Sequence, residues 1–415
     1  MHKFQHAKNT VRYYILIVFL LAFLFVSNDF GLIDVQKTAI IMAAGIDREE
    51  DTFIVTSQVA VPQSAGQNPS TKAVQIVSRG KTIADAFDEI NAKTGWYPKL
   101  VFCNLLLLGS KAAEENVFDA LDFFLRDEYL TDNCFVAVCD GFAKDLLNVS
   151  ALVDSASSLA ITKVLSSHAK RVGTVLPSTL REFSIGYFGD GSGFLPLLSK
   201  QAQQEEIGNS SSPPSQNNGS SSGSSGSSSG GSSNQNSGQA GGEMPQNQPV
   251  FSAQETALFV EGKKSEILTP QETFAVSAVM NKLQLAPYTV ISSDGYCTLT
   301  IKDNAPKIRL SIENGIPILK IRITFSAGIR DYSKAQDLSE ISDAGDVPTG
   351  VFTLAKKQME SDLFSAFEKS RGVNCDLFGI KSLLEKYENK HYKKLKDAIL
   401  QTVRLHVDVS FRNVR

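Results

Sequence analysis

A low-complexity stretch in the middle of the chain does most to limit what it can fold into. Gly208 to Gly242 consists almost entirely of Ser, Gly, Asn, Gln and Pro and contains no aromatic residue. Such a stretch cannot bury enough apolar surface to offset the entropy lost on ordering. We therefore predict a flexible linker over residues 201–249, between an ordered region at 31–200 and another at 250–415.

The N-terminus carries the longest apolar run, Tyr13–Val26, which follows Lys3, Lys8 and Arg12. A short apolar core behind positive charge is typical of a secretory signal, although it is short for a spanning helix. Residues 25–28 fit a signal-peptide cleavage site badly. A lipoprotein would need a Cys just after the apolar run, whereas the first Cys is Cys103. We therefore predict an uncleaved signal anchor over residues 1–30, with the rest of the chain exported. Cleavage and a buried helix of a cytosolic protein are the alternatives.

The region 31–200 alternates strand and helix patterns, which is typical of sheets flanked by helices. It is predicted to form one or two α/β domains, beginning with a hairpin whose polar turn is Asp47–Thr52. The predicted strands are Lys37–Ile46, Phe53–Val61, 74–78, Leu100–Leu108 and Cys134–Cys139, and the predicted helices are Lys81–Lys93 and 117–125.

The region 250–415 is predicted to be an α+β domain with an antiparallel sheet. Glu313-Asn314-Gly315 is typical of a tight hairpin turn. Strands are predicted at Thr298–Ile301, Lys307–Ile312, Ile316–Phe325 and Val403–Phe411, and helices at 352–372 and 380–387. For the whole chain, we expect a membrane-anchored, multi-domain α+β fold with mixed or antiparallel sheets flanked by helices.

Charge and cysteine content exclude several classes. The chain has 41 Lys and Arg against 44 Asp and Glu, so its net charge gives no argument for nucleic-acid binding. Its five Cys contain no CxxC pair, and Cys103, Cys134 and Cys139 lie in apolar runs. We interpret them as small buried side chains rather than as a zinc site or a disulfide framework.

Several segments, in order, resemble the Ger(x)C family, the C subunits of the nutrient germinant receptors of bacterial spores. The segments are Asp34–Asp47 with Phe53–Pro62, Gly80–Ala86, Leu121–Asp127, Glu255–Thr273 and Asp376–Tyr387, together with the closing strand. The resemblance implies a three-domain body of helix-flanked sheets on the outer face of the spore inner membrane. It also implies two integral membrane subunits as partners and a non-enzymatic role in triggering germination by nutrients.

One departure from the family concerns the anchor. Typical members are lipoproteins with a Cys followed by Trp-Asp near the start, whereas Asp29–Asp34 has neither the Cys nor the Trp. Without that Cys, we expect no lipid attachment there, and the apolar run Tyr13–Val26 is then the expected membrane anchor.

The sequence offers no catalytic, cofactor or metal motif. Gly189–Gly193 (GDGSG) matches neither a nucleophile elbow nor a dinucleotide fingerprint, and we interpret it as a surface turn. Asp47, Glu49 and Asp51 have calcium-loop spacing, but Thr52 stands where that loop needs Gly. No catalytic residue, metal ligand or cofactor is therefore predicted.

Two charged segments are candidate contact sites. Arg126 and Asp127 at the end of a predicted helix are our candidate partner contact, with a solvated helix end as the alternative. Four Lys within Lys390–Lys396 form either a solvated face or a contact with anionic membrane lipid. Two other functions stay open: a free-standing membrane-anchored solute-binding protein, and a membrane-anchored hydrolase with a dispersed site.

Overall fold

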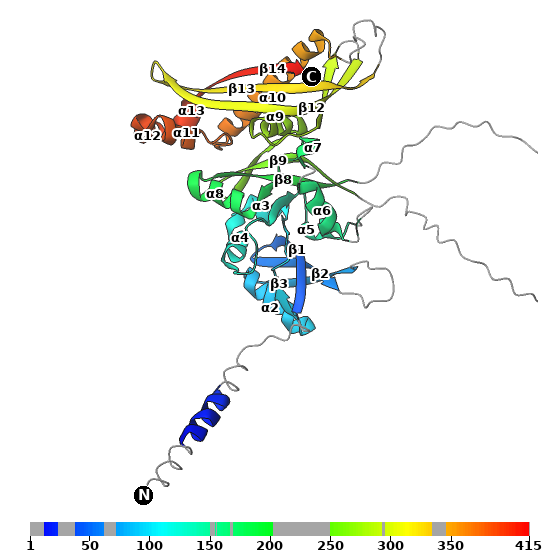
Figure 1. Cartoon of the computed structure of the whole chain (residues 1–415), viewed down its shortest axis with the longest axis vertical. Helices are drawn as coiled ribbons and strands as arrows, with labels where there is room; N and C mark the ends of the chain where they lie inside the picture. The colour runs from blue at the N-terminus through cyan, green and yellow to red at the C-terminus, as the bar shows by residue number, and fades with distance from the viewer. Residues whose placement is uncertain are drawn as a thin grey trace, which may run out of the picture.

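The structure is a computed structural model that describes residues 12–23, 38–61, 72–149, 154, 156–166, 169–201, 250–292, 295–333 and 346–414. It shows a two-domain α+β protein with mixed sheets, and a short helix at residues 12–23 stands apart from the body (Figure 1). None of the described helices combines the length and the apolar composition needed to cross a membrane. The predicted linker at 201–249 lies outside the described residues apart from its first residue.

The first domain is built on a mixed sheet that, within the described residues, runs in the order β10-β9-β8-β6-β5-β1-β2-β3, with β4 and β7 at its sides. Its strands are β1 (Thr38–Glu49), β2 (Thr52–Val61), β3 (Lys72–Gly80), β4 (Tyr97–Lys99), β5 (Leu105–Leu108), β6 (Phe135–Cys139), β7 (Ser178–Thr179), β8 (Ser192–Gln201), β9 (Val250–Val260) and β10 (Lys263–Leu268). Its helices are α2 (Ile83–Thr94), α3 (Ser110–Glu114), α4 (Val117–Arg126), α5 (Ala143–Leu147), α6 (Ser157–Leu165), α7 (Ala169–Val172) and α8 (Leu180–Asp190).

Both faces of this sheet are buried. In β5, Leu106 and Leu108 belong to one apolar core, whereas Leu105 and Leu107 belong to the core on the other face. Successive side chains of a strand point to opposite faces, so a continuous apolar run is what a doubly covered strand requires. Cys134 and Cys139 likewise lie in different cores, and all five Cys are buried and free. Their predicted burial is confirmed.

The second domain has the strand order β11-β12-β13-β14 within the described residues. The strands are β11 (Ala286–Ser292), β12 (Gly295–Glu313), β13 (Ile316–Ser333) and β14 (Arg404–Asn413). The helices are α9 (Pro270–Val279), α10 (Thr349–Gly372), α11 (Ile380–Tyr387), α12 (Asn389–Leu395) and α13 (Ile399–Thr402). Met359 and Leu363 of α10 belong to the same apolar core as Ile321 and Ile323 of β13.

Three predictions about this architecture were wrong. The second sheet is mixed, because β14 runs parallel to β13 rather than antiparallel. The two strands predicted at Thr298–Ile301 and Lys307–Ile312 are one strand, β12, which absorbs its irregularities as register shifts. The strand predicted at Leu100–Leu108 begins only at Leu105, because the chain turns at Val101 and Phe102 after β4 pairs with β1.

The first hairpin also differs from its prediction. Asp47 lies within β1 rather than in the turn, which is formed by Glu50 and Asp51. The Asp47 carboxylate is buried, and it accepts hydrogen bonds from the backbone N–H of Ala143 (2.7 Å) and Lys144 (3.0 Å). These two hydrogen bonds tie the end of β1 to the start of α5.

The end of β8 and the start of β9 lie side by side, although a long segment of the chain separates them in sequence. Gln201 and Val250 are register partners in the antiparallel pair β8–β9. Because the two ends already meet, we expect deletion of residues 210–242, which shortens the connection roughly threefold, to stabilise the fold by about 1 kcal/mol through loop-closure entropy. The thermal unfolding midpoint of the full chain in mild detergent should stay constant or rise by about 2–4 °C. A fall of more than about 5 °C would show that the segment is structural.

A partly buried acid on α10, Asp362, makes the stability of the fold depend on pH. Burial, with the nearby charge of Glu272, raises the pKa of Asp362 to about 6, and its Oδ2 has no hydrogen-bond partner. Glu272 is itself paired with Lys369 at 2.8 Å, and its pKa is lowered because that pairing and further hydrogen bonds outweigh its burial. Asp362 therefore costs stability as pH rises from about 4, where the unfolded group ionises, to about 6.

We expect Asp362→Asn to have wild-type stability near pH 4. Its advantage should grow to about 1–3 kcal/mol near pH 6 and stay constant above, after allowance for solvent screening of a partly buried group. Urea unfolding at pH 4, 5, 6 and 7 measures the difference. Parallel curves for the two proteins across this range would contradict the assignment.

Candidate functional site

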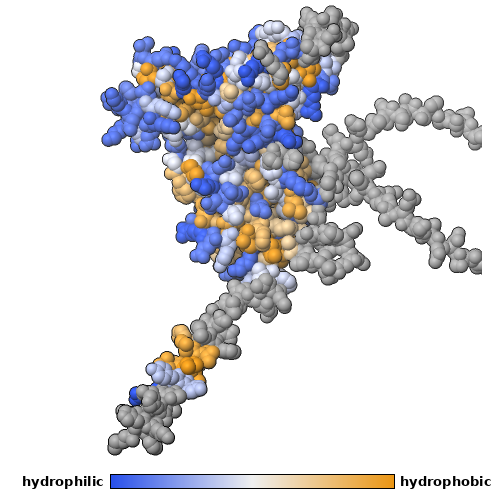
Figure 2. Space-filling model, viewed as in Figure 1, coloured by the Kyte–Doolittle hydropathy of each residue, from blue (hydrophilic) through white to orange (hydrophobic). Residues whose placement is uncertain are grey.

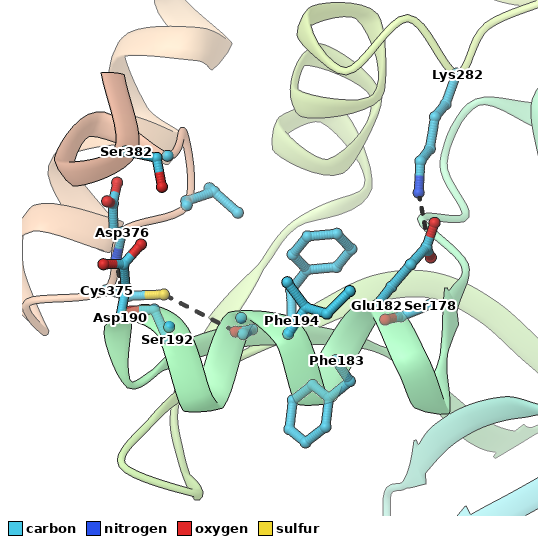
Figure 3. Close-up of a pocket in the computed structure, with 16 residues that line it drawn as sticks. Ser178, Glu182, Phe183, Asp190, Ser192, Phe194, Lys282, Cys375, Asp376 and Ser382 are labelled. Atoms are coloured by element: carbon cyan, nitrogen blue, oxygen red, sulfur yellow. Dashed lines mark hydrogen bonds and ion pairs between the residues drawn. The ribbon is translucent and has the colours of Figure 1, made fainter. Parts of the chain in front are cut away.

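The two domains meet at a cleft of about 410 Å³ (Figure 3). One wall is α8 and the start of β8, and the other comes from the segments around Lys282 and residues 375–382. Cavities of this size accommodate small solutes. We call the contacts between these walls the domain joint.

Local sequence explains how α8 forms its wall. Thr179 and Glu182 make a capping box, in which the Thr179 side chain accepts from Glu182 N–H and the Glu182 carboxylate accepts from Thr179 N–H. The helix ends at Gly191, whose φ of 69° is left-handed and favours glycine. Gly193 follows because a Cβ there would lie 2.7 Å from the Phe183 ring. The GDGSG segment is thus the turn between α8 and β8.

The segment is a turn, as predicted, but it does not lie free on the surface. Ser192 is only 5% exposed, and its Oγ accepts a hydrogen bond of 2.9 Å from the backbone N–H of Asp376. Lys381 Nζ donates to the Asp190 carbonyl at 3.3 Å, and the Cys375 thiol approaches the Gly193 carbonyl at 3.9 Å. Three residues at the junction of α8 and β8 in the first domain therefore contact three residues of the second domain.

The buried acid of the joint has a structural task. The Asp376 carboxylate accepts from the backbone N–H of Ile380 (2.6 Å) and Lys381 (2.8 Å) at the start of α11. Burial raises the pKa of Asp376, and these two hydrogen bonds oppose the rise. Burial also raises the pKa of the Cys375 thiol to about 12, so the sulfur stays protonated and is a poor nucleophile.

The charges of the cleft lie at opposite ends. Figure 3 shows Asp376 and Asp190 at one end and Lys282 with Glu182 at the other, with Phe194 between them. Lys282 Nζ lies 3.9 Å from the Glu182 carboxylate and donates to the Pro177 carbonyl at 3.2 Å. Burial lowers the pKa of Lys282, whereas Glu182 opposes this shift. The arrangement can hold a small polar solute and can join the two domains.

The potential metal ligands are scattered in the part of the chain that the structure covers. Among the described residues, no group of three or more His, Cys, Asp or Glu side chains is placed to hold a metal ion. Asp47, which has calcium-loop spacing with Glu49 and Asp51, is occupied by two backbone amides.

The candidate partner contact lies away from the cleft, at the end of α4. The Arg126 side chain is 79% exposed and pairs with Asp122 one turn earlier at 2.8 Å. Asp127 accepts from the backbone N–H of Tyr129 (2.8 Å) and Leu130 (3.0 Å), which fixes the turn after the helix. Phe124 is buried and Phe123 stacks on Phe87 at 5.3 Å, so both rings serve the core. Of the two candidate residues, Arg126 is therefore the exposed one, in an ion pair within its own helix.

Sequence reasoning missed the domain joint. Asp376 lies inside the Asp376–Tyr387 segment, where an acid four residues before the first helical residue and a Gly at Gly379 could have indicated a capped helix start. Nothing in the pattern places Ser192 opposite Asp376, since they are far apart in the chain.

Two mixed-sheet domains, held together by contacts between side chains of one and the backbone of the other, define this molecule as a two-domain α+β protein. Residues 32–200 match the family described as "Spore germination protein N-terminal domain", and residues 254–415 match "Spore germination B3/ GerAC like, C-terminal". The chain belongs to the GerAC/GerBC-like family of spore germination proteins, a family of germinant receptor C subunits that are not known enzymes.

A solved structure has the same fold. The chain superposes on the crystal structure of the GerBC protein with a TM-score of 0.52 and 16% identity, covering 90% of this chain and 97% of that one. At this identity the likeness concerns the fold alone. No curated protein matches the chain.

Proposed function

We propose that this chain is a non-enzymatic subunit of a spore germinant receptor. It acts on the outer face of the inner membrane and assembles with two integral membrane subunits so that nutrients trigger germination. The observation that carries this proposal is the match of both ordered regions, in order, to the two domains of the spore germination family.

The N-terminus supports the proposed location. Tyr13–Val26 is continuously apolar, and the described helix at residues 12–23 covers most of this run. Three basic residues precede it, and positive flanks stay on the cytoplasmic side. The body then lies on the opposite side, held by an uncleaved anchor.

The test uses spores that lack this chain. They should lose their response to nutrients, and the full chain should restore it. The chain should also remain in washed inner membranes and co-purify with two integral membrane proteins after cross-linking. Normal nutrient germination without the chain, or its release by the wash, would contradict the proposal.

Arg126 tests the partner surface. Because its ion pair with Asp122 is exposed, we expect Arg126→Ala to change the free energy of unfolding by less than about 0.5 kcal/mol. The variant should nevertheless co-purify less with the membrane subunits and slow the nutrient response. Arg181→Ala, at an exposed Arg of α8, is the matched control. Wild-type co-purification of Arg126→Ala would leave Arg126 as a solvated helix end.

The cleft favours a second candidate function, solute binding. Its volume and its separated charges suit a small polar molecule. Equilibrium dialysis of the full chain in detergent against nutrient amino acids tests it, with Lys282→Met as the variant expected to lose binding. Equal retention by both proteins would contradict binding in the cleft.

A further inference from the structure

The first domain carries an exposed aromatic patch beside β4. We define this patch by its five outward-facing side chains: Trp96, Tyr97, Val101, Phe102 and Tyr129. Trp96 is 45%, Phe102 57% and Tyr129 53% exposed, and Trp96 is the only Trp of the chain. Clusters of exposed large apolar side chains mark interaction sites.

Two chain segments form the patch, residues 96–102 and Tyr129. Gly95, with a φ of 71°, ends α2 and turns the chain into β4. Lys99, the last residue of β4, places its ammonium 4.5 Å from the centre of the Tyr129 ring. This contact joins the β4 turn to the segment after α4.

The core does not need these side chains. Leu100 and Cys103 are 4% and 1% exposed, while Val101 and Phe102 between them point outward. The first domain is thus already filled by their neighbours. An exposed aromatic cluster that does not contribute to the core indicates a surface that another molecule or a membrane contacts.

The position of the patch indicates that environment. β4 pairs in parallel with the first residues of β1, Thr38 opposite Tyr97, so the patch flanks the point where the chain enters the body. The residues between Val26 and Thr38 can span at most about 40 Å. A membrane that holds the apolar run therefore lies within reach of this end of the body, and the C-terminal domain lies at the other end (Figure 1).

The composition of the patch fits a lipid surface. Trp and Tyr favour the headgroup level of a bilayer, where the ring is half in lipid and its polar atom meets water. Lys99 adds a cation for lipid phosphate. Figure 2 shows apolar residues gathering on the N-terminal domain, while the C-terminal domain is mostly hydrophilic on this face. The basic run Lys390–Lys396 lies in that far domain, on α12 and the residue after it.

We propose that the aromatic patch rests in the headgroup region of the bilayer that holds the N-terminal run. This proposal deepens, and rests on, the membrane location proposed above. The patch then fixes the tilt of the body relative to the membrane. β4 and the end of α4 face the bilayer, and the domain joint lies farther from it. The tether alone sets only a distance, whereas the patch sets an orientation.

The single Trp provides the measurement. The full chain is reconstituted into phosphatidylethanolamine and phosphatidylglycerol vesicles whose acyl chains are brominated. We expect Trp96 emission to fall about twofold relative to unbrominated vesicles, since the ring lies at headgroup depth. Acrylamide in the water should quench Trp96 less in the vesicle-bound chain than in the chain unfolded by urea without detergent.

A matched control moves the Trp to the far domain. Trp96→Phe combined with Phe364→Trp places it at an exposed position of α10. This protein should show no quenching by brominated lipid and full quenching by acrylamide. Phe102→Ser, at an exposed position, should reduce lipid quenching of Trp96 without changing the unfolding midpoint.

Flotation of the same vesicles separates this proposal from the anchor. A chain that does not float contradicts both. A chain that floats while Trp96 stays unquenched by lipid contradicts the patch alone. Shielding of Trp96 that rises with protein concentration but not with bromination identifies a second copy as the occupant, and also overturns the proposal.

Discussion

Asp47→Ala is expected to lower the free energy of unfolding by about 2–4 kcal/mol, because it leaves one buried and one partly buried backbone N–H group without their acceptor. These are the amides of Ala143 and Lys144 at the start of α5. Gly109 packs against the carboxylate, since a Cβ at this position would lie 2.1 Å from Asp47 Oδ1. The loss is less than two full desolvation costs, because burial disfavours the charged carboxylate and raises its pKa.

Urea unfolding of the full chain in detergent measures the change. Asp51→Ala is the control, because Asp51 lies exposed in the neighbouring turn, and it should stay within about 0.5 kcal/mol of wild type. Asp47→Asn keeps one acceptor oxygen and should fall between the two. If Asp47→Ala is as stable as Asp51→Ala, the carboxylate does not hold α5 in place.

Asp376→Ala is expected to have a comparable effect on stability, about 2–4 kcal/mol, and to loosen the domain joint. The amides of Ile380 and Lys381 lose their buried acceptor, so the start of α11 frays. The same segment donates to Ser192 and carries the Lys381 contact to Asp190. Loss of order there should therefore separate the second domain from β8.

Hydrogen exchange reads this effect locally. The amides of Ile380 and Lys381 should exchange at least about tenfold faster in Asp376→Ala, as a loss of 1.4 kcal/mol or more implies. Asp190→Ala is the control, because the joint uses only the backbone carbonyl of Asp190. Unchanged exchange at both amides, with the fold intact, would show that Asp376 does not cap α11.

The sequence pattern correctly predicted features that depend on neighbouring residues alone, such as turns and the buried face of a strand. Glu313-Asn314-Gly315 forms the expected hairpin turn, since Asn314 and Gly315 adopt φ of 51° and 82°. Leu319 and Ile321 are buried as their alternation predicts. Alternation identifies which face of a strand is buried.

Pairing between distant strands was not predictable in the same way. β14 alternates as a half-exposed strand should, but alternation does not reveal whether its neighbour runs parallel or antiparallel. For the same reason, the pattern of β9 did not show that it completes the first sheet beside β8. The joint depends on that pairing, because β8 and β9 carry the carbonyls of Gly193 and Phe259 that meet Cys375.

The way the first sheet closes has a consequence for biosynthesis. Its last two strands, β9 and β10, are made only after residues 202–249, so β8 leaves the ribosome without its neighbour. β13 waits longer still for its parallel partner, β14. Pairings so distant in sequence form slowly, and unpaired strand edges invite aggregation. A nascent chain stopped before Val250 would thus expose the edge of β8, and translation beyond Asn413 is needed before both sheets are complete.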